Sequence, residues 1–173
     1  QKKTGKILLD GIPIHTLPMK EMRNILGKKI AFIPQNSAGA LNPLYKVGPQ
    51  FEFVLKWRFG IQSSQAKQTA KEWFEKVHLK PVNSFIKRYP HQLSGGQMQR
   101  VMIAMAMAVR PRLLVADEIT TALDANLKNE ILDLVFSLIK ESKTAVLLIS
   151  HDLHLIKSYC DRIAVMEKGC IVE

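Results

Sequence analysis

Leu93-Ser94-Gly95-Gly96-Gln97 opens an apolar run that leads to a second stretch, Leu113-Leu114-Val115-Ala116-Asp117-Glu118. Ser94 can cap the start of a helix, and the two glycines let backbone amides approach an anion that the helix dipole also favours. The second stretch is an unbroken apolar strand with two adjacent carboxylates at its carboxyl end, where open parallel sheets place their ligands. These residues therefore predict a phosphate site at 94–97 and a site for Mg²⁺ and a general base at Asp117 and Glu118.

Three apolar segments are expected to form buried strands, and each is followed by a polar residue. The segments and the residues that follow them are 30–33 with Gln35, 113–116 with Asp117 and Glu118, and 144–149 with His151. Parallel pairing would bring the carboxyl ends of these strands to one edge of the sheet. The sequence therefore predicts an α/β fold with a mostly parallel sheet, in which four residues distant in sequence form one constellation.

The rest of the chain is expected to be mainly helical. A strand is predicted at 6–9 and a closing hairpin at 163–166 and 170–172. Helices are predicted at 18–26, over 47–77 with Ser64 as a cap, from Pro81, and from 95 to 109. A further helix is capped by Asp124. Cys160 is expected in a helix and Cys170 in a strand. Because the two cysteines lack metal-ligand spacing, we interpret both as structural.

Length and composition fit a single packed domain. The chain has 173 residues, of which 47% are hydrophobic, and it contains no apolar run of bilayer-spanning length. Its first residues show no signal-peptide pattern, so we expect a cytoplasmic protein. The formal net charge is +10, but the basic residues are scattered and do not form a stripe interleaved with aromatic residues. Nucleic acid is therefore not an expected partner.

Five motifs together suggest a family. Leu93 to Arg100 resembles the signature sequence of ATP-binding cassette (ABC) ATPases, and Leu113–Glu118 resembles their Walker B strand. The other three are Ile33-Pro34-Gln35, similar to the Q-loop, Thr120-Thr121-Ala122-Leu123-Asp124, similar to the D-loop, and Ser150-His151-Asp152, similar to the switch histidine. One such motif alone is weak evidence, whereas this set follows the family's order over nearly the whole chain.

The resemblance implies a P-loop NTPase-like (RecA-like) core with an inserted helical subdomain. Residues 1–45 and 101–173 would form parts of the core, and residues 46–100 would form the helical subdomain that carries the signature. It also implies ATP and Mg²⁺ as cofactors, with a role for each motif. By this resemblance, Asp117 would bind Mg²⁺ through water, Glu118 would be the general base, and Gln35 would contact the metal and the attacking water. His151 would contact the γ-phosphate, and Asp124 would bridge two cassettes. ATP held by a second cassette would be bound by Ser94, Gly95, Gly96 and Gln97.

The chain departs from the family pattern at two places. No Gly-x-x-x-x-Gly-Lys-Ser/Thr occurs, because Gly27-Lys28-Lys29 lacks the required glycine and hydroxyl residue. Since the later motifs are intact, we expect a protein truncated at its N-terminus, without the first strands, the P-loop (Walker A) and its helix, and the fragment alone is expected to be inactive. Ile119 also replaces the usual proline after the glutamate, which is expected to loosen the following turn slightly.

Two further segments resemble the oligopeptide, dipeptide and nickel importer branch of the family, namely Leu41-Asn42-Pro43 and Tyr89-Pro90-His91-Gln92. That resemblance implies a second ABC ATPase subunit, transmembrane permease subunits, indirect contact with a solute-binding protein, and a place on the inner face of the cell membrane. Two hypotheses stay open: an importer ATPase, and a non-hydrolysing partner that offers only its signature face. A DNA-repair or translation ATPase is disfavoured, because no coiled coil is inserted between Gln35 and Ser94.

Overall fold

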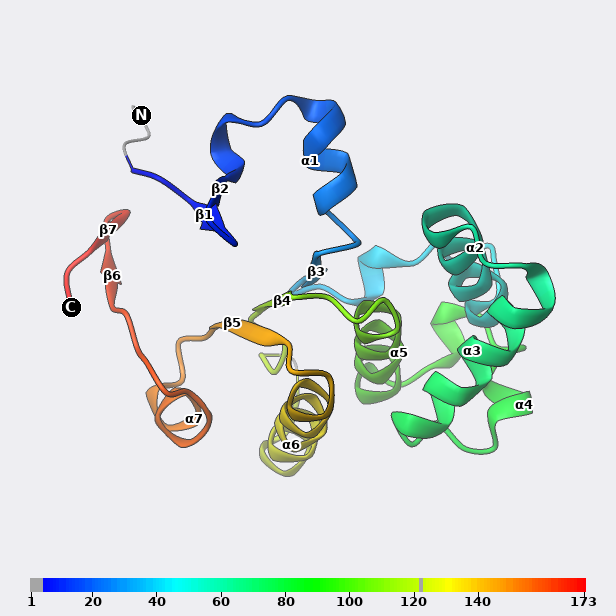
Figure 1. Cartoon of the computed structure of the whole chain (residues 1–173). Coiled ribbons are helices and arrows are strands. Elements are labelled where there is room, and N and C mark those ends of the chain that lie inside the picture. Colours follow the sequence, from blue (N-terminus) through cyan, green and yellow to red (C-terminus); the bar gives the residue numbers. More distant parts are fainter. Residues whose placement is uncertain (1–4, 122) are drawn as a thin grey trace.

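A computed structural model describes residues 5–121 and 123–173, so Ala122 of the D-loop-like stretch lies outside the described residues. The centre is a parallel sheet in the order β3-β4-β5 (Figure 1). Its strands are β3 (Ile30–Ile33), β4 (Leu113–Asp117) and β5 (Ala145–Ile149). The three strands expected from the sequence, and their parallel pairing, are therefore confirmed.

Helices account for most of the remaining chain. They are α1 (Met19–Ile25), α2 (Val47–Phe59), α3 (Ser63–Lys76), α4 (Val82–Phe85), α5 (Gly95–Met107), α6 (Ala125–Ser142) and α7 (Leu153–Tyr159). Short 3₁₀ turns lie at Ile14–Thr16, Ala38–Ala40 and Pro90–Gln92. In the described part of the chain, no helix is both long and apolar enough to cross a membrane.

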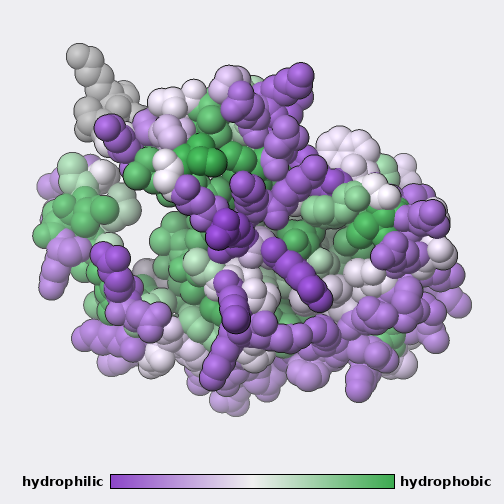
Figure 2. Space-filling view, viewed as in Figure 1, coloured by the Kyte–Doolittle hydropathy of each residue, from purple (hydrophilic) through white to green (hydrophobic). Residues whose placement is uncertain are grey.

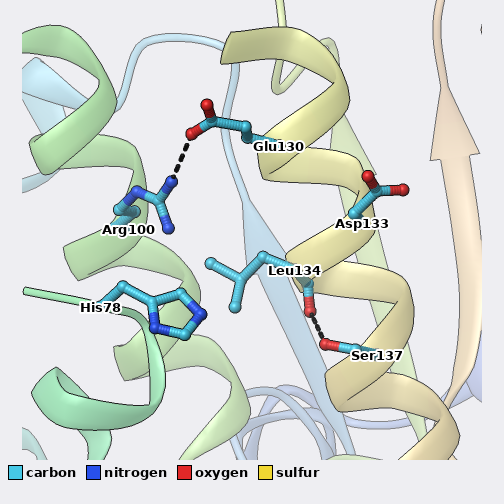
Figure 3. Close-up of a pocket in the computed structure, with 6 residues that line it drawn as sticks. All are labelled: His78, Arg100, Glu130, Asp133, Leu134 and Ser137. Carbon is cyan, nitrogen blue, oxygen red and sulfur yellow. Dashed lines mark hydrogen bonds and ion pairs between the residues drawn. The ribbon is translucent and has the colours of Figure 1, made fainter. Parts of the chain in front are cut away.

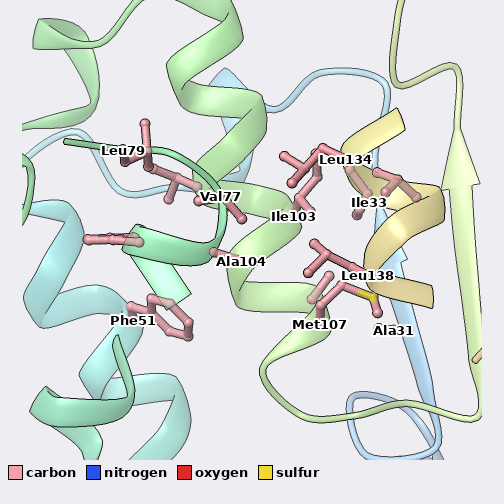
Figure 4. Close-up of a cluster of buried hydrophobic side chains, with 14 of the residues drawn as sticks. Ala31, Ile33, Phe51, Val77, Leu79, Ile103, Ala104, Met107, Leu134 and Leu138 are labelled. Atoms are coloured by element: carbon pink, nitrogen blue, oxygen red, sulfur yellow. The ribbon is translucent and has the colours of Figure 1, made fainter. Parts of the chain in front are cut away.

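One face of the sheet is covered by α5 and α6 (Figures 1 and 4). In the strand register, Ile33 lies beside Ala116 on β4, and Ala116 lies beside Leu148 on β5. Ile33 and Ala116 are fully buried, and they belong to the same core cluster as Met107 of α5 and Leu138 of α6. Burial of this apolar row is the main driving force that fixes the helices on the sheet.

The opposite face of the sheet is open over much of its area. Phe32 pairs in register with Val115, which pairs with Leu147, and the side chains of Phe32 and Leu147 are 54% and 53% exposed. Ile149, at the end of β5, is 44% exposed. Exposed hydrophobic residues also gather on the two small hairpins formed by the ends of the chain, β1 (Leu8–Leu9) with β2 (Ile12–Pro13) and β6 (Met166–Glu167) with β7 (Cys170–Ile171) (Figure 2).

The expected helix at 47–77 is two helices. Gly60 ends α2 in the left-handed conformation with φ of 66°, a backbone state that glycine adopts without steric cost. The next helix, α3, starts at Ser63 with Gln62 at its N-cap, so the prediction of Ser64 as a cap was wrong. The two helices pack together through Phe51 and Phe74, whose ring centroids are 5.7 Å apart.

The C-terminal part follows the prediction with one exception. The closing hairpin is present with shorter strands, and Cys170 lies in β7 as expected. Cys160 was expected in a helix, but α7 ends at Tyr159 and the backbone of Cys160 is extended, with φ of −109° and ψ of 138°. At its other end, α7 is capped by Asp152, which accepts from the amides of His154 and Leu155.

Candidate active site

Glu118 follows β4 directly and is the centre of the site. Its backbone amide donates to the carbonyl of Ile149 at 2.9 Å, which ties it to the end of β5. Its φ of 47° lies in the left-handed region, which is uncommon for a residue with a side chain and is found preferentially at functional sites. The sheet therefore holds the backbone of Glu118 in a defined but energetically costly conformation.

Three side chains from separate segments meet at the Glu118 carboxylate. Gln35, after β3, donates from Nε2 to Oε2 at 2.8 Å, and Thr121 donates from Oγ1 to the same oxygen at 2.9 Å. His151, after β5, lies with Nδ1 3.1 Å from Oε1. The sheet edge thus brings together Gln35, Glu118 and His151, as the strand pattern predicted.

These contacts change the acidity of the glutamate. The hydrogen bond with His151 is the largest influence and that from Thr121 the second, and together they hold the pKa of Glu118 below its ordinary value. Burial acts in the opposite direction but is weaker. Glu118 is therefore ionised near neutral pH, which a group that accepts a proton requires.

Asp117 is the last residue of β4 and pairs in register with Ile149. Its carboxylate is half-buried and next in sequence to Glu118. In the described residues, no group of three or more histidine, cysteine, aspartate or glutamate side chains is arranged to hold a metal ion. Mg²⁺ usually keeps several waters and takes one or two carboxylates plus substrate phosphates, so Asp117 and the amide oxygen of Gln35 fit that ion rather than a fully coordinated structural metal.

The phosphate site expected at 94–97 is a helix start with reciprocal caps. Ser94 Oγ accepts from the backbone amide of Gln97 at 3.3 Å, and Gln97 Oε1 accepts from the amide of Ser94 at 3.1 Å. The amides of Gly95 and Gly96 belong to the first helical turn, where backbone N–H groups have no partner within the helix. This turn can therefore receive an anion at its backbone donors.

The same turn packs against the start of α6. A β-carbon added to Gly96 would lie 2.6 Å from Cδ2 of Leu127, which is too close for any real contact. Asp124, the N-cap of α6, accepts from the amide of Leu127 at 3.0 Å. A side chain at position 96 would therefore need the Leu127 side chain to move, a packing role of Gly96 that the sequence did not show.

No hydrogen bond between residues 94–97 and the side chains of Gln35, Glu118 or His151 is present in the described ranges. The sequence-predicted residues therefore form two groups, one at the sheet edge and one at the start of α5.

Sequence reasoning did not single out Thr121. A signal was available, because its position three residues after Glu118 suits a turn, and its amide donates to the Glu118 carbonyl at 3.1 Å.

Two cavities flank helix α5. The larger, about 570 Å³, lies beside the loop after β3 and is lined by Ala40, Leu41, Asn42, Tyr45, Pro49, Gln50, Phe53, Val54 and Met105. The other, about 370 Å³, lies between α5 and α6, where Arg100 pairs with Glu130 at 3.0 Å (Figure 3). Arg100 also donates to the carbonyl of Val77 at 3.2 Å, so it ties α5 to both neighbouring segments.

The comparison with protein families identifies the chain. The family model described as "ABC transporter" matches residues 1–121. The chain belongs to the ABC transporter family. Its five motifs therefore occur in a member of the family that they resemble.

Two similar relatives are named as ATP-binding proteins of peptide transport. Oligopeptide transport ATP-binding protein OppD of Bacillus subtilis is 43% identical over 171 residues, covering 99% of this chain and 48% of that protein. Dipeptide transport ATP-binding protein DppD of Escherichia coli is 41% identical over 168 residues, covering 97% of this chain and 51% of that protein. The chain thus spans about half the length of these relatives.

A solved structure supports the fold. The ATP-binding cassette MJ0796, in a dimeric post-hydrolysis state bound to ADP and Pi, superposes with a TM-score of 0.84 at 29% sequence identity. The match covers 98% of this chain and 72% of that one. The predicted P-loop NTPase-like architecture, with its parallel sheet and flanking helices, is therefore confirmed as that of an ABC cassette.

Proposed function

We propose that this chain is the ATP-hydrolysing part of an importer subunit that couples ATP hydrolysis to peptide uptake. The observation that carries the proposal is the convergence of Gln35, Thr121 and His151 on the ionised carboxylate of Glu118. The peptide cargo is supported by the relatives, which are named for oligopeptides and dipeptides. Nickel or other metal complexes, also implied by the resembled branch, have no such support.

Each residue at the sheet edge has a proposed role in hydrolysis. Glu118 accepts the proton of the attacking water, while Gln35, bonded to the same carboxylate, orients that water. His151 contacts the γ-phosphate from the end of β5. Asp117 and Gln35 would hold Mg²⁺, which neutralises charge on the transferred phosphate when it is bound.

A second cassette is the proposed partner of the α5 start. Ser94, Gly95, Gly96 and Gln97 would bind ATP held by that cassette, and Asp124 would bridge the two. This division of labour is supported by the lack, in the residues that the structure describes, of a hydrogen bond between residues 94–97 and the Glu118 side chain. It is also supported by the dimeric state of the related MJ0796 cassette.

Transmembrane permease subunits are the proposed partners of the larger cavity. Tyr45 and Phe53, which line it, are 61% and 63% exposed, and Leu44 and Trp57 nearby in the sequence are 79% and 71% exposed. Apolar exposure of this extent, around a cavity and next to the Gln35 loop, suits an apolar partner helix. The protein would then lie on the inner face of the cell membrane and contact a solute-binding protein only indirectly.

The decisive experiment measures phosphate release from Mg-ATP by a protein in which this chain follows an in-frame phosphate-binding loop and its helix. Hydrolysis that disappears in the Glu118→Gln variant supports the proposal. Dimerisation with ATP but no hydrolysis by the unchanged sequence would instead establish the non-hydrolysing partner cassette. Absence of both ATP binding and dimerisation would contradict either function.

A further inference from the structure

A buried hydrogen bond joins the loop after β3 to helix α5. The hydroxyl of Ser37 donates to Oε1 of Gln99, and the two residues are 8% and 4% exposed. In the described part of the chain, the amide nitrogen Nε2 of Gln99 is buried without a hydrogen-bond partner. If the amide were turned round, Nε2 would donate to Ser37 and Oε1 would lack a partner instead. The link to Ser37 is therefore present in either orientation.

Stability of the fold alone does not account for a glutamine at position 99. A buried amide with one unsatisfied end costs free energy that an apolar side chain of similar size avoids. Met98 and Val101, on the same helix, are buried without such a cost. What Gln99 adds to the core is the polar link to Ser37.

The loop at one end of this link carries Gln35. Ser37 lies two residues after Gln35, and residues 36–40 form a compact turn with its own hydrogen bonds. Asn36 Oδ1 accepts from the amide of Gly39 at 3.2 Å, and the carbonyl of Ser37 accepts from the amide of Ala40 at 3.3 Å. Because only Asn36 separates Ser37 from Gln35 in the chain, a displacement of Ser37 is transmitted to the Gln35 backbone.

The helix at the other end carries the phosphate-binding turn. Gln99 lies five residues after the Ser94 cap and two after Gln97, within the continuous helix α5. A packed helix moves as a rigid element. A shift at the start of α5 therefore reaches Gln99 and, through Ser37, the loop that holds Gln35 on Glu118.

We propose that Gln99 is a positioning residue for ATP hydrolysis. Through Ser37, it makes the position of the Gln35 amide on Glu118 follow the position of helix α5. The catalytic part of this inference rests on the proposed function, whereas the mechanical link between loop and helix does not. ATP bound at residues 94–97 would thereby set the alignment of Gln35 in the same chain.

The link is tested on the chain itself by hydrogen–deuterium exchange. The variants Gln99→Leu and Ser37→Ala remove one partner each, and Ser37→Thr retains the hydroxyl. Ser137→Ala is the control, because it removes an exposed serine whose hydroxyl donates within α6, to the carbonyl of Leu134.

We expect the amides of Gly39 and Ala40 to exchange about tenfold faster in Gln99→Leu and Ser37→Ala, with β4 and α6 unchanged. Ser37→Thr and the control should retain the original rates. Unchanged exchange in both Gln99→Leu and Ser37→Ala would overturn the link. If Gln99→Leu unfolds, Gln99→Met, which fills a similar volume without the amide, takes its place.

The catalytic part is tested in the ATPase that includes a phosphate-binding loop. Gln99→Leu should lower kcat about tenfold and change KM less than about twofold, because it misaligns Gln35 without removing a nucleotide contact. If Gln99 acts through Gln35, adding Gln99→Leu to Gln35→Ala should lower kcat no further. A fully multiplicative loss would overturn the positioning role. A wild-type protein without hydrolysis would overturn the proposed function, while the exchange experiment would still decide the link.

Discussion

The side-chain amide of Gln35 donates a 2.8 Å hydrogen bond to the carboxylate of Glu118, although 83 positions separate the two residues. The bond spans adjacent strands of the sheet, since Gln35 follows β3 and Glu118 follows β4. Parallel pairing alone brings their backbones to one edge. The side-chain bond adds an orientation, because it directs the amide toward the Glu118 carboxylate.

Glu118→Gln should lower turnover at least about 100-fold, because the change removes the proton acceptor and retains the shape of the side chain. ATP binding should persist, and an ATP-bound dimer should accumulate. Phosphate release and size-exclusion chromatography of the ATPase with its phosphate-binding loop measure both effects. Hydrolysis by the variant at the original rate would refute Glu118 as the base.

Removing the His151 ring should raise the pKa of Glu118. The hydrogen bond with His151 is the largest cause of the lowered pKa, so His151→Ala should let Glu118 take up its proton at higher pH. A carboxyl group with a lowered pKa stabilises the fold above its unfolded pKa, and this contribution is lost as pH falls through the folded pKa. His151→Ala should therefore weaken that pH-dependent stabilisation.

Carbon-13 NMR of the Glu118 carboxyl group measures this titration directly. Thr121→Val, which removes the second hydrogen bond, should raise the pKa in the same direction but less. His154→Ala is the control, because it removes a different histidine, on α7. A Glu118 titration that is identical in His151→Ala and the original chain would contradict the electrostatic role of His151.

Gly96→Ala should destabilise the chain by about 1–3 kcal/mol, because the added methyl group would overlap Leu127. Gly95→Ala is a matched control one residue away, where a β-carbon would lie 4.0 Å from Leu123. It should be neutral or slightly stabilising. Denaturant unfolding measures both. Leu127→Ala should cost less in the Gly96→Ala background than alone, and strict additivity would argue against the predicted contact.

Gly96→Asp tests the phosphate site rather than the packing alone. It introduces a negative charge where backbone amides should meet phosphate, so ATP-driven dimerisation should fail. Gly96→Ala in the same assay separates the effect of charge from that of size. Normal dimerisation of Gly96→Asp with ATP would contradict the role of residues 94–97.

The open sheet face predicts a gain from an added segment. Phe32 and Leu147 lie in one exposed apolar row, and exposed rows of this kind favour aggregation. An in-frame phosphate-binding loop with its helix should cover the row and improve solubility and nucleotide binding together. The 173-residue chain alone should show no measurable ATP hydrolysis.

Paired purification of the two chains, followed by chromatography and nucleotide titration, measures that gain. Phe32→Thr should improve the solubility of the 173-residue chain, because it makes the exposed row more polar, and should remove part of the benefit of the added segment. Tight Mg-ATP binding and turnover by the 173-residue chain would show that other residues replace the phosphate-binding loop.

The sequence predicted the sheet and its edge because both follow from local patterns. Apolar runs define the three strands, and parallel pairing then places Gln35, Glu118 and His151 together. The break at Gly60 and the end of α7 were missed, because a helix end depends on one residue's conformation and on packing. The Ser37–Gln99 hydrogen bond could not be predicted from the sequence either, since no local pattern indicates which buried polar groups meet across 62 positions.

Ile119, in the place of the family's usual proline, was expected to loosen the turn after Glu118. Its side chain is 3% exposed and belongs to the hydrophobic core, and Thr120 after it is 6% exposed. The turn is therefore anchored by burial, without the fixed ring of a proline. It follows that the hydrophobic core also fixes the backbone next to Glu118, the residue proposed as the proton acceptor. Core substitutions near Ile119 would thus displace the Glu118 side chain, and so impair its proposed role in hydrolysis, before they unfold the protein.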